Sequence, residues 1–248
     1  MISALAITYN EEDYIERYVQ QLSFADEIIF IDSFSTDNTV DLAQKYGVKV
    51  IQRKFDNFST QRNFALEHAS NDWVIFFDLD ESLPNQLISE IKTIVKENSK
   101  NYAYRVKRNF YFMGKHIKYS GFQNDTVVRL FNKTKCTYNG NLVHETLSVN
   151  GTIGSLKNTL DHYTYKTFDD YNKKQTQYSK LQAKHLYNKN VRPNLYHFFV
   201  RPLYRFLHQY FIKLGFLDGK EGFILAYLQG FSVFKRYLFL WTTYRNIE

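Results

Sequence analysis

A short apolar run passes directly into three carboxylates in the stretch Trp73-Val74-Ile75-Phe76-Phe77-Asp78-Leu79-Asp80-Glu81. The run Trp73–Phe77 has the length and composition of a buried strand. Carboxylates this close repel one another unless a cation or basic side chains compensate their charge. Their hard oxygens suit Mg²⁺ or Mn²⁺, which proteins usually hold together with substrate phosphates. The alternative is an acidic cap on the next helix, because Glu81 and Ser82 precede Pro84.

Strands and helices alternate from residue 1 to about residue 100. Apolar, β-like runs are separated by stretches whose apolar residues recur at helical spacing. This order predicts an α/β fold, with βαβ units around a mainly parallel central sheet and flanking helices. The expected strands are Ser3–Thr8, Glu27–Asp32, Val48–Gln52 and Trp73–Phe77, and the expected helices are Glu11–Leu22, Thr39–Tyr46, Ser59–Ala69 and Leu87–Val95.

Polar loops follow the first, second and fourth of these strands, at Tyr9–Glu12, Asp32–Asp37 and Asp78–Glu81. Ligands of parallel sheets bind beyond the carboxyl ends of the strands, so we expect these loops to lie at one site. Asp32 can accept hydrogen bonds from ribose or a base edge, or it can belong to a turn in which Asp37 caps a helix. Thr8, Tyr9 and Asn10 can frame a nucleobase, with Tyr9 stacking on it.

The chain changes character after residue 100. Residues 102–162 favour β-structure, and the pattern is helical from Thr167 onward, where Thr167 and Asp170 have the spacing of a capping box. Aromatic and aliphatic residues such as Phe199, Leu203, Tyr227 and Phe231 then recur at helical spacing among Lys and Arg. Such helices are typical of segments that lie on an anionic membrane leaflet, although packing against the rest of the chain explains the aromatic residues equally well.

Composition narrows the setting. The chain has 248 residues, of which 44% are hydrophobic and 18% aromatic, so it can bury a sizeable core. Its net charge of +7 is typical of a protein with a negatively charged partner, or simply of one with a basic, soluble surface. A single cysteine, Cys136, excludes an intrachain disulfide and a cysteine-based zinc cluster. The first residues do not have the pattern of a signal peptide, and no apolar run reaches the ~18 residues that span a bilayer, so we expect a cytoplasmic protein.

Four motifs, in their order and approximate spacing, resemble the signature of family 2 glycosyltransferases. They are Ile7-Thr8-Tyr9-Asn10-Glu11-Glu12, Ile31–Thr39, Gln61-Arg62-Asn63 and Asp78-Leu79-Asp80-Glu81. Further motifs resemble a subgroup that contains lipopolysaccharide core glucosyltransferases: Arg129-Leu130-Phe131, Tyr138-Asn139-Gly140, Val143-His144-Glu145 and Gly215-Phe216-Leu217-Asp218-Gly219. The resemblance therefore covers nearly the whole chain.

The resemblance implies a GT-A fold and an inverting transfer of a hexose, glucose being the first choice. The donor would be a nucleoside diphosphate sugar, UDP-linked, and the acceptor a glycan or lipid-linked sugar such as lipopolysaccharide core. It implies a catalytic domain over residues 1–165 and a helical extension over 166–248. Residues 1–100 would bind the donor and 101–165 would face the acceptor. Contact with the anionic inner leaflet of the membrane is expected for such acceptors.

The resemblance also assigns residues. Those that would contact the nucleotide sugar are Thr8, Tyr9, Asn10 and Glu12 in the nucleoside pocket, Asp32 at the base or ribose, Arg62, and Asp78 at the ribose or diphosphate. Asp80 would bind the metal, Mg²⁺ or Mn²⁺, and His162 would be a further ligand unless it is a structural histidine. Glu145 would be the catalytic base. Glu81 replaces the second acid of the familiar Asp-Asp pair, which leaves its role open.

Two other classes of function share some of these features. A sugar nucleotidyltransferase has the same kind of sheet and metal, but it typically has a Gly-rich phosphate loop where this chain has Asn10-Glu11-Glu12. A basic, aromatic module that binds membranes or nucleic acid would carry basic residues where the acidic loops stand, because bare carboxylates do not bind phosphates. We therefore expect no nucleic-acid partner.

Overall fold

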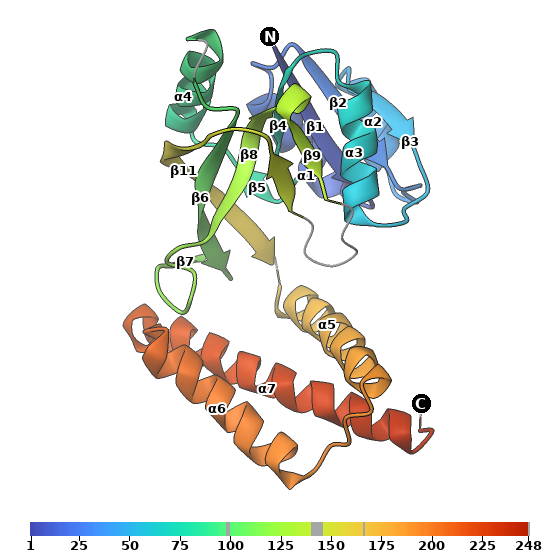
Figure 1. Ribbon diagram of the computed structural model, residues 1–248, viewed down its shortest axis with the longest axis vertical. Helices are drawn as coiled ribbons and strands as arrows, with labels where there is room; N and C mark the ends of the chain where they lie inside the picture. The colour runs from blue at the N-terminus through green and yellow to red at the C-terminus, as the bar shows by residue number, and fades with distance from the viewer. Residues whose placement is uncertain (98–99, 140–145, 166, 248) are drawn as a thin grey trace. The chain divides into compact units, whose positions relative to one another are not determined.

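The computed structural model describes residues 1–97, 100–139, 146–165 and 167–247 (Figure 1). The chain forms two compact units. The sheet unit comprises Met1–Arg108 and Thr126–His162, and the helical unit comprises Asn109–Asp125 and Tyr163–Glu248. Residues 109–125 thus belong with the helices, although the sequence analysis grouped them with the acceptor-side half. The functional boundary at residues 165 and 166 stays a prediction.

The expected βαβ organisation of the first hundred residues is confirmed. Strands β3, β2, β1 and β4 lie side by side in this order and pair in parallel. The sheet continues through β8, β6, β11 and β5, and the described pairings β4–β8, β6–β8 and β11–β5 are antiparallel. The strands are β1 Ile2–Thr8, β2 Glu27–Asp32, β3 Lys49–Gln52, β4 Trp73–Phe76, β5 Glu81–Ser82, β6 Ala103–Phe112, β8 Thr126–Asn132 and β11 Ile153–Tyr165. Shorter strands are β7 Lys115–Ile117, which pairs with β6, and β9 Cys136–Tyr138, which pairs with β10 Leu147–Val149.

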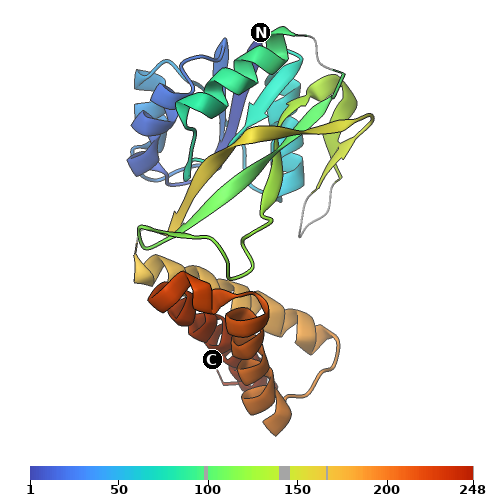
Figure 2. The ribbon, with the colours of Figure 1, turned by 90° about the vertical axis from the view of Figure 1, so that its left-hand side faces the viewer.

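Both faces of the parallel strands are buried. Side chains alternate between the faces of a strand, so Ala4 and Ala6 of β1 join one apolar cluster and Leu5 joins another. Helices α1 (Glu12–Gln21) and α4 (Asn85–Lys96) contribute to the first cluster, and α3 (Phe58–His68) contributes to the second. Helices therefore cover both faces of the parallel strands (Figure 2), as is usual for a parallel sheet, whose ligands bind beyond the carboxyl ends of its strands.

Side-chain hydrogen bonds lie at the starts of two helices. Helix α2 (Thr39–Lys45) has Asn38 at its N-cap without a side-chain cap bond, so Asp37 is not the cap that the sequence predicts, although its carboxylate accepts a hydrogen bond from the Thr39 N–H (3.0 Å). Helix α3 starts one residue earlier than predicted, because Asn57 accepts the bond from the Thr60 N–H (2.9 Å). Ser59 is buried within the first turn of the helix.

The helical unit is built around α7 (Gly219–Tyr244), which packs against α5 (Phe168–Asn188) and α6 (Arg201–Leu207). The capping box at Thr167 and Asp170 is confirmed. Turns of π-helix, Tyr196–Val200 and His208–Ile212, flank α6. Pro202 has no N–H to donate to the preceding turn, and a wider turn is one way for a helix to pass such a residue. Within the described ranges, no helix is both long and apolar enough to cross a membrane.

Asp218 joins the two separate segments of the helical unit. Its carboxylate accepts hydrogen bonds from the N–H groups of Lys118 (2.9 Å) and Tyr119 (3.1 Å) and from the Ser120 hydroxyl (2.7 Å). The side chain is buried, so these donors replace water. Through Asp218, the Gly215–Gly219 motif thus holds residues 109–125 against the second, C-terminal segment of the helical unit.

We expect Asp218→Asn to lower the free energy of unfolding by about 2 kcal/mol, because an amide accepts fewer and weaker bonds than a carboxylate. Urea unfolding would measure the change. Glu221→Gln is the matched control, since Glu221 forms an exposed ion pair with Lys115 in the same unit and should matter little. Equal effects of the two substitutions would contradict the role given to Asp218.

Candidate functional site

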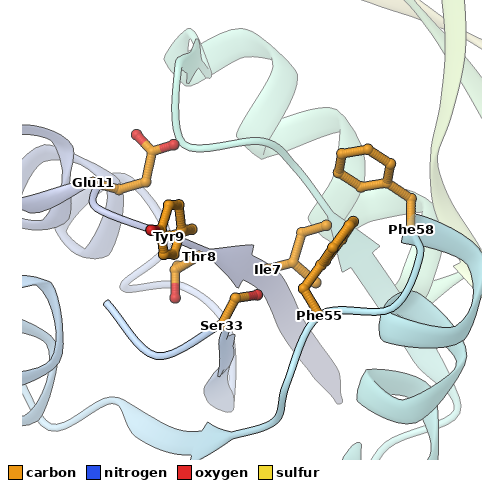
Figure 3. Close-up of a pocket in the computed structure, with 7 residues that line it drawn as sticks. All are labelled: Ile7, Thr8, Tyr9, Glu11, Ser33, Phe55 and Phe58. Atoms are coloured by element: carbon orange, nitrogen blue, oxygen red, sulfur yellow. The ribbon is translucent and has the colours of Figure 1, made fainter. Parts of the chain in front are cut away.

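A cavity of about 420 Å³ lies where β1 and β2 end (Figure 3). Aromatic rings border it, and Tyr9, Phe55 and Phe58 remain 58%, 42% and 47% exposed. The rings of Phe55 and Phe58 meet edge to face, with centroids 5.0 Å apart. The full lining is Ile7, Thr8, Tyr9, Glu11, Ser33, Phe55 and Phe58. Exposed aromatic faces around a hollow of this size are suited to a planar ring such as a nucleobase.

The side chain of Asp32, at the end of β2, is fully buried and holds together the residues around it. Its carboxylate accepts hydrogen bonds from the Thr8 hydroxyl (3.0 Å), the Ser35 N–H (2.9 Å) and the Gln52 amide (3.3 Å). Parallel pairing places Thr8 opposite Asp32, so the register of β1 and β2 brings the two together. Asp32 therefore fixes the loop after β2.

Asn10 and Glu12 tie the loop after β1 to the loop after β2. Asn10 has a left-handed backbone (φ 57°), and its side-chain oxygen accepts a bond from the Thr36 N–H (2.8 Å). The Glu12 carboxylate accepts bonds from the backbone (3.0 Å) and side-chain (2.8 Å) nitrogens of Asn38. Of the residues expected in the nucleoside pocket, Thr8 and Tyr9 line the cavity, whereas Asn10, Glu12 and Asp32 shape the loops beside it.

Two of the three carboxylates after β4 are neutralised by arginines. Arg129 of β8 contacts the carboxylates of both Asp78 and Glu81, with 2.6 Å to the Glu81 Oε1. Arg62 of α3 lies 3.0 Å from the Asp78 Oδ1 and over the ring of Phe76 (4.6 Å). Burial opposes the ionisation of Asp78, but the guanidinium groups of Arg129 and Arg62 hold its pKa well below the usual range. Arg62 thus binds Asp78 in this structure.

Glu81 is turned into the protein and is fully buried. Its Oε2 accepts the Asp78 N–H (3.1 Å), and Arg108 lies 3.7 Å from its Oε1. Burial raises the pKa of Glu81, and the nearby Asp78 charge adds to this effect. The helix-cap alternative is wrong, because α4 begins after Pro84 with no side-chain cap. Glu81 instead anchors Arg129, which in turn orients Asp78.

Asp80 is the carboxylate of the three that has no arginine partner among the described contacts. Its Oδ2 lies 3.3 Å from the His162 Nε2, and its Oδ1 is buried without a hydrogen-bond partner within the described residues. Pairing of β5 with β11 places His162 opposite Glu81 and so brings it to Asp80. A buried carboxylate oxygen without a donor is costly unless a cation or a ligand completes it.

Asp80 and His162 fit a metal that the protein holds only in part. No group of three His, Cys, Asp or Glu residues in the described ranges could hold an ion alone. One carboxylate and one imidazole, completed by phosphate oxygens and water, are a donor set that Mg²⁺ or Mn²⁺ accepts. Glu145, the expected base, lies outside the described residues.

Sequence reasoning missed several residues that shape this site. Phe55 and Phe58 lie before and at the start of α3, and no pattern in the sequence marked them as part of a cavity. Arg129 was quoted only as part of a motif, but an arginine inside the apolar run Val127–Phe131 could have indicated a buried carboxylate partner.

Comparisons with known proteins match this geometry to a family. Residues 3–148 match the model of glycosyl transferase family 2, so the chain belongs to the family 2 glycosyltransferases. The α/β fold with its C-terminal helices is accordingly of the GT-A type.

Two relatives found by sequence span nearly the whole chain, and one solved structure aligns with less than half of it. An uncharacterized glycosyltransferase of Rickettsia typhi is 30% identical over 95% of this chain and 85% of its own. The lipopolysaccharide core biosynthesis glycosyltransferase LpsC of Rhizobium meliloti is 27% identical over 95% of this chain and 93% of its own. Glucosyl-3-phosphoglycerate synthase of Mycobacterium tuberculosis, solved with Mn²⁺ and UDP, aligns with 25% identity over 45% of this chain and 44% of its own, with a TM-score of 0.38. Family membership favours a glycosyltransferase over the nucleotidyltransferase and the non-enzymatic module.

Proposed function

We propose that the chain transfers a hexose from a nucleoside diphosphate sugar to a glycan or lipid-linked acceptor. Glucose is our first choice for the hexose. The buried, unpartnered Oδ1 of Asp80 carries this proposal, because it lies in the acidic loop after β4, one of the three loops at the carboxyl ends of the parallel strands. The full-length similarity to LpsC supports an acceptor of the lipopolysaccharide core type. We place the reaction in the cytoplasm, at the inner face of the membrane.

Asp80 and His162 would hold Mg²⁺ or Mn²⁺ against the donor diphosphate. The bound ion would offset the negative charge that develops on the leaving diphosphate. Asp78 would meet the ribose or diphosphate while Arg129 and Arg62 keep its carboxylate ionised. We propose that Arg62 also contacts the nucleotide, and that Asp32 acts on the nucleotide through the loop that it fixes.

The cavity at β1 and β2 would take the nucleobase, for which we propose uracil. Tyr9 would stack on the base, and base–aromatic stacking contributes about 1–3 kcal/mol. We therefore expect Tyr9→Ala to weaken UDP binding by about tenfold with little change in kcat at saturating donor. Titration calorimetry with UDP would measure it, with Tyr46→Ala, an exposed tyrosine at the end of α2, as the control. Unchanged UDP affinity in Tyr9→Ala would remove the stacking assignment.

Glu145 is proposed as the base that takes the proton of the acceptor hydroxyl while its oxygen attacks the anomeric carbon, which inverts the configuration. We expect Glu145→Gln to bind the donor normally and to lose about 10²-fold in transfer rate, since general-base catalysis contributes at least this much. Single-turnover transfer and donor titration would separate the two effects. Near-normal turnover would place the base elsewhere.

A screen of nucleotide sugars tests the reaction class. The chain should release a nucleoside diphosphate from one or a few of them, and a chelator should stop the release. Formation of pyrophosphate from a nucleoside triphosphate would contradict the proposal. The sugar that is hydrolysed fastest would replace glucose as the first choice if it differs.

A further inference from the structure

The helical unit exposes many bulky apolar side chains. Along the segment from Leu195 to Ile212 they recur every three or four residues, so they form a stripe on one side of the helix. Phe199, Leu203 and Tyr204 are 68%, 57% and 67% exposed. We call the following set the apolar face: Leu195, Tyr196, Phe199, Val200, Leu203, Tyr204, Leu207, Phe211 and Ile212, with Phe223, Tyr227 and Phe231 of α7.

A groove of about 430 Å³ runs between α6 and α7 within this face. Gly230 permits the close approach of the helices, because a Cβ there would lie 2.9 Å from the Pro202 carbonyl oxygen. Apolar side chains, including Leu203, Phe223 and Phe231, form nearly all of the lining. A groove of this character is suited to a hydrocarbon chain rather than to a polar ligand.

The charged side chains of residues 195–247, the stretch that carries the apolar face, are mostly positive. Residues 195–247 contain seven Lys and Arg residues and two acids, a difference of 7 − 2 = +5. Both acids are engaged, Asp218 with the backbone of residues 118 and 119, and Glu221 with Lys115. Arg201, Lys213 and Lys220 are exposed. A second copy of this face would bring like charges together, whereas an anionic surface would compensate them.

We propose that the apolar face is a docking surface for an anionic phospholipid bilayer. Its aromatic and aliphatic side chains would enter the interfacial layer, and the groove would take one acyl chain. The exposed cations would meet the lipid phosphates. The contact is peripheral, in keeping with the length and polarity of the described helices. It rests on the helical unit alone and is independent of the proposed transfer reaction.

Sedimentation of the full chain with vesicles tests this docking. Vesicles of phosphatidylcholine mixed with phosphatidylglycerol should bind the chain, vesicles of phosphatidylcholine alone should bind it much more weakly, and high salt should reverse the binding. Arg201→Glu with Lys213→Glu should lower the partition coefficient by at least about 30-fold, since the loss of each cation costs about a fivefold factor and the new carboxylates repel the anionic lipids. Phe199→Ser with Leu203→Ser should lower it by at least about tenfold.

Matched controls lie on α5. Lys173→Glu with Lys184→Glu alters exposed cations, and Tyr178→Ser with Leu181→Ser alters exposed apolar residues, so both pairs should leave binding unchanged. Circular dichroism and donor hydrolysis in each variant show whether the fold and the sheet unit are intact. Equal binding to both kinds of vesicle, or loss of binding with the α5 variants, would overturn the proposal. The proposal would also be overturned if the chain formed a dimer in the absence of lipid and the Phe199 and Leu203 substitutions dissociated that dimer. If the chain hydrolysed no nucleotide sugar, the proposed function would be contradicted. Vesicle binding would still test the docking proposal, because it does not depend on the transfer reaction.

Discussion

Asp80→Ala should lower the rate of metal-dependent sugar transfer by about 10³-fold, the largest loss that we expect from a single substitution. Asp80 has a buried carboxylate oxygen without a hydrogen-bond partner in the described part of the chain, and its other oxygen lies 3.3 Å from His162. Alanine would remove one of the two protein groups proposed to hold the ion. The folded state should persist, because the substitution removes a buried polar atom that no donor satisfies.

Transfer assays over a range of Mn²⁺ concentrations would measure this effect. A higher Mn²⁺ requirement in Asp80→Ala, together with full inhibition of the unsubstituted chain by a chelator, would support the assignment. Asp41→Ala is the control, because it removes one exposed carboxylate from α2. Activity of Asp80→Ala near that of the unsubstituted chain would place the ion elsewhere.

Arg129→Met should lower the free energy of unfolding by about 3–5 kcal/mol, the cost of leaving a buried carboxylate without its partner. Arg129 contacts both Asp78 and Glu81, and Glu81 is fully buried. Methionine has a similar length but carries no charge. Without the guanidinium group, Glu81 would take up a proton, and Asp78 would lose the contact that orients it.

Urea unfolding of single and double variants would apportion this loss. Arg129→Met combined with Glu81→Gln should be more stable than Arg129→Met alone, because no unpaired buried charge remains. Arg53→Met, which breaks a more exposed ion pair with Asp56, is the control and should change stability little. An Arg129→Met variant as stable as the unsubstituted chain would mean that Glu81 is already protonated.

The sheet was predictable from the sequence because its signals are local. Apolar runs such as Ile2–Thr8 and Trp73–Phe76 identify strands without reference to the rest of the chain. Because parallel strands end at the same edge of a sheet, the loops that follow them are expected to lie together. The partners of Asp78 and Glu81 were not predictable in this way. Arg62 and Arg129 lie 16 and 51 residues from Asp78 along the chain, and only the pairing of β8 beside β4 brings Arg129 to it.

The different roles of the three acidic residues could not be predicted from the sequence for the same reason. Spacing alone gave Asp78, Asp80 and Glu81 similar prospects as ligands, since each follows β4 closely. Burial and the arginines separate them, because Glu81 is enclosed and Asp80 is left with an unpartnered oxygen. The exposed rings of Phe55 and Phe58 were missed because exposure depends on the whole fold and not on a local pattern.

The bonds from Lys118 and Tyr119 to Asp218 bear on how the chain matures. They join positions 100 and 99 residues apart, so residues 109–125 leave the ribosome well before their acceptor exists. Until then the two N–H groups depend on water, and the nascent loop is open to proteases and chaperones. A chain that ends before residue 218 should therefore carry residues 109–125 without their acceptor, and we expect proteases to cleave it there more readily than the full chain.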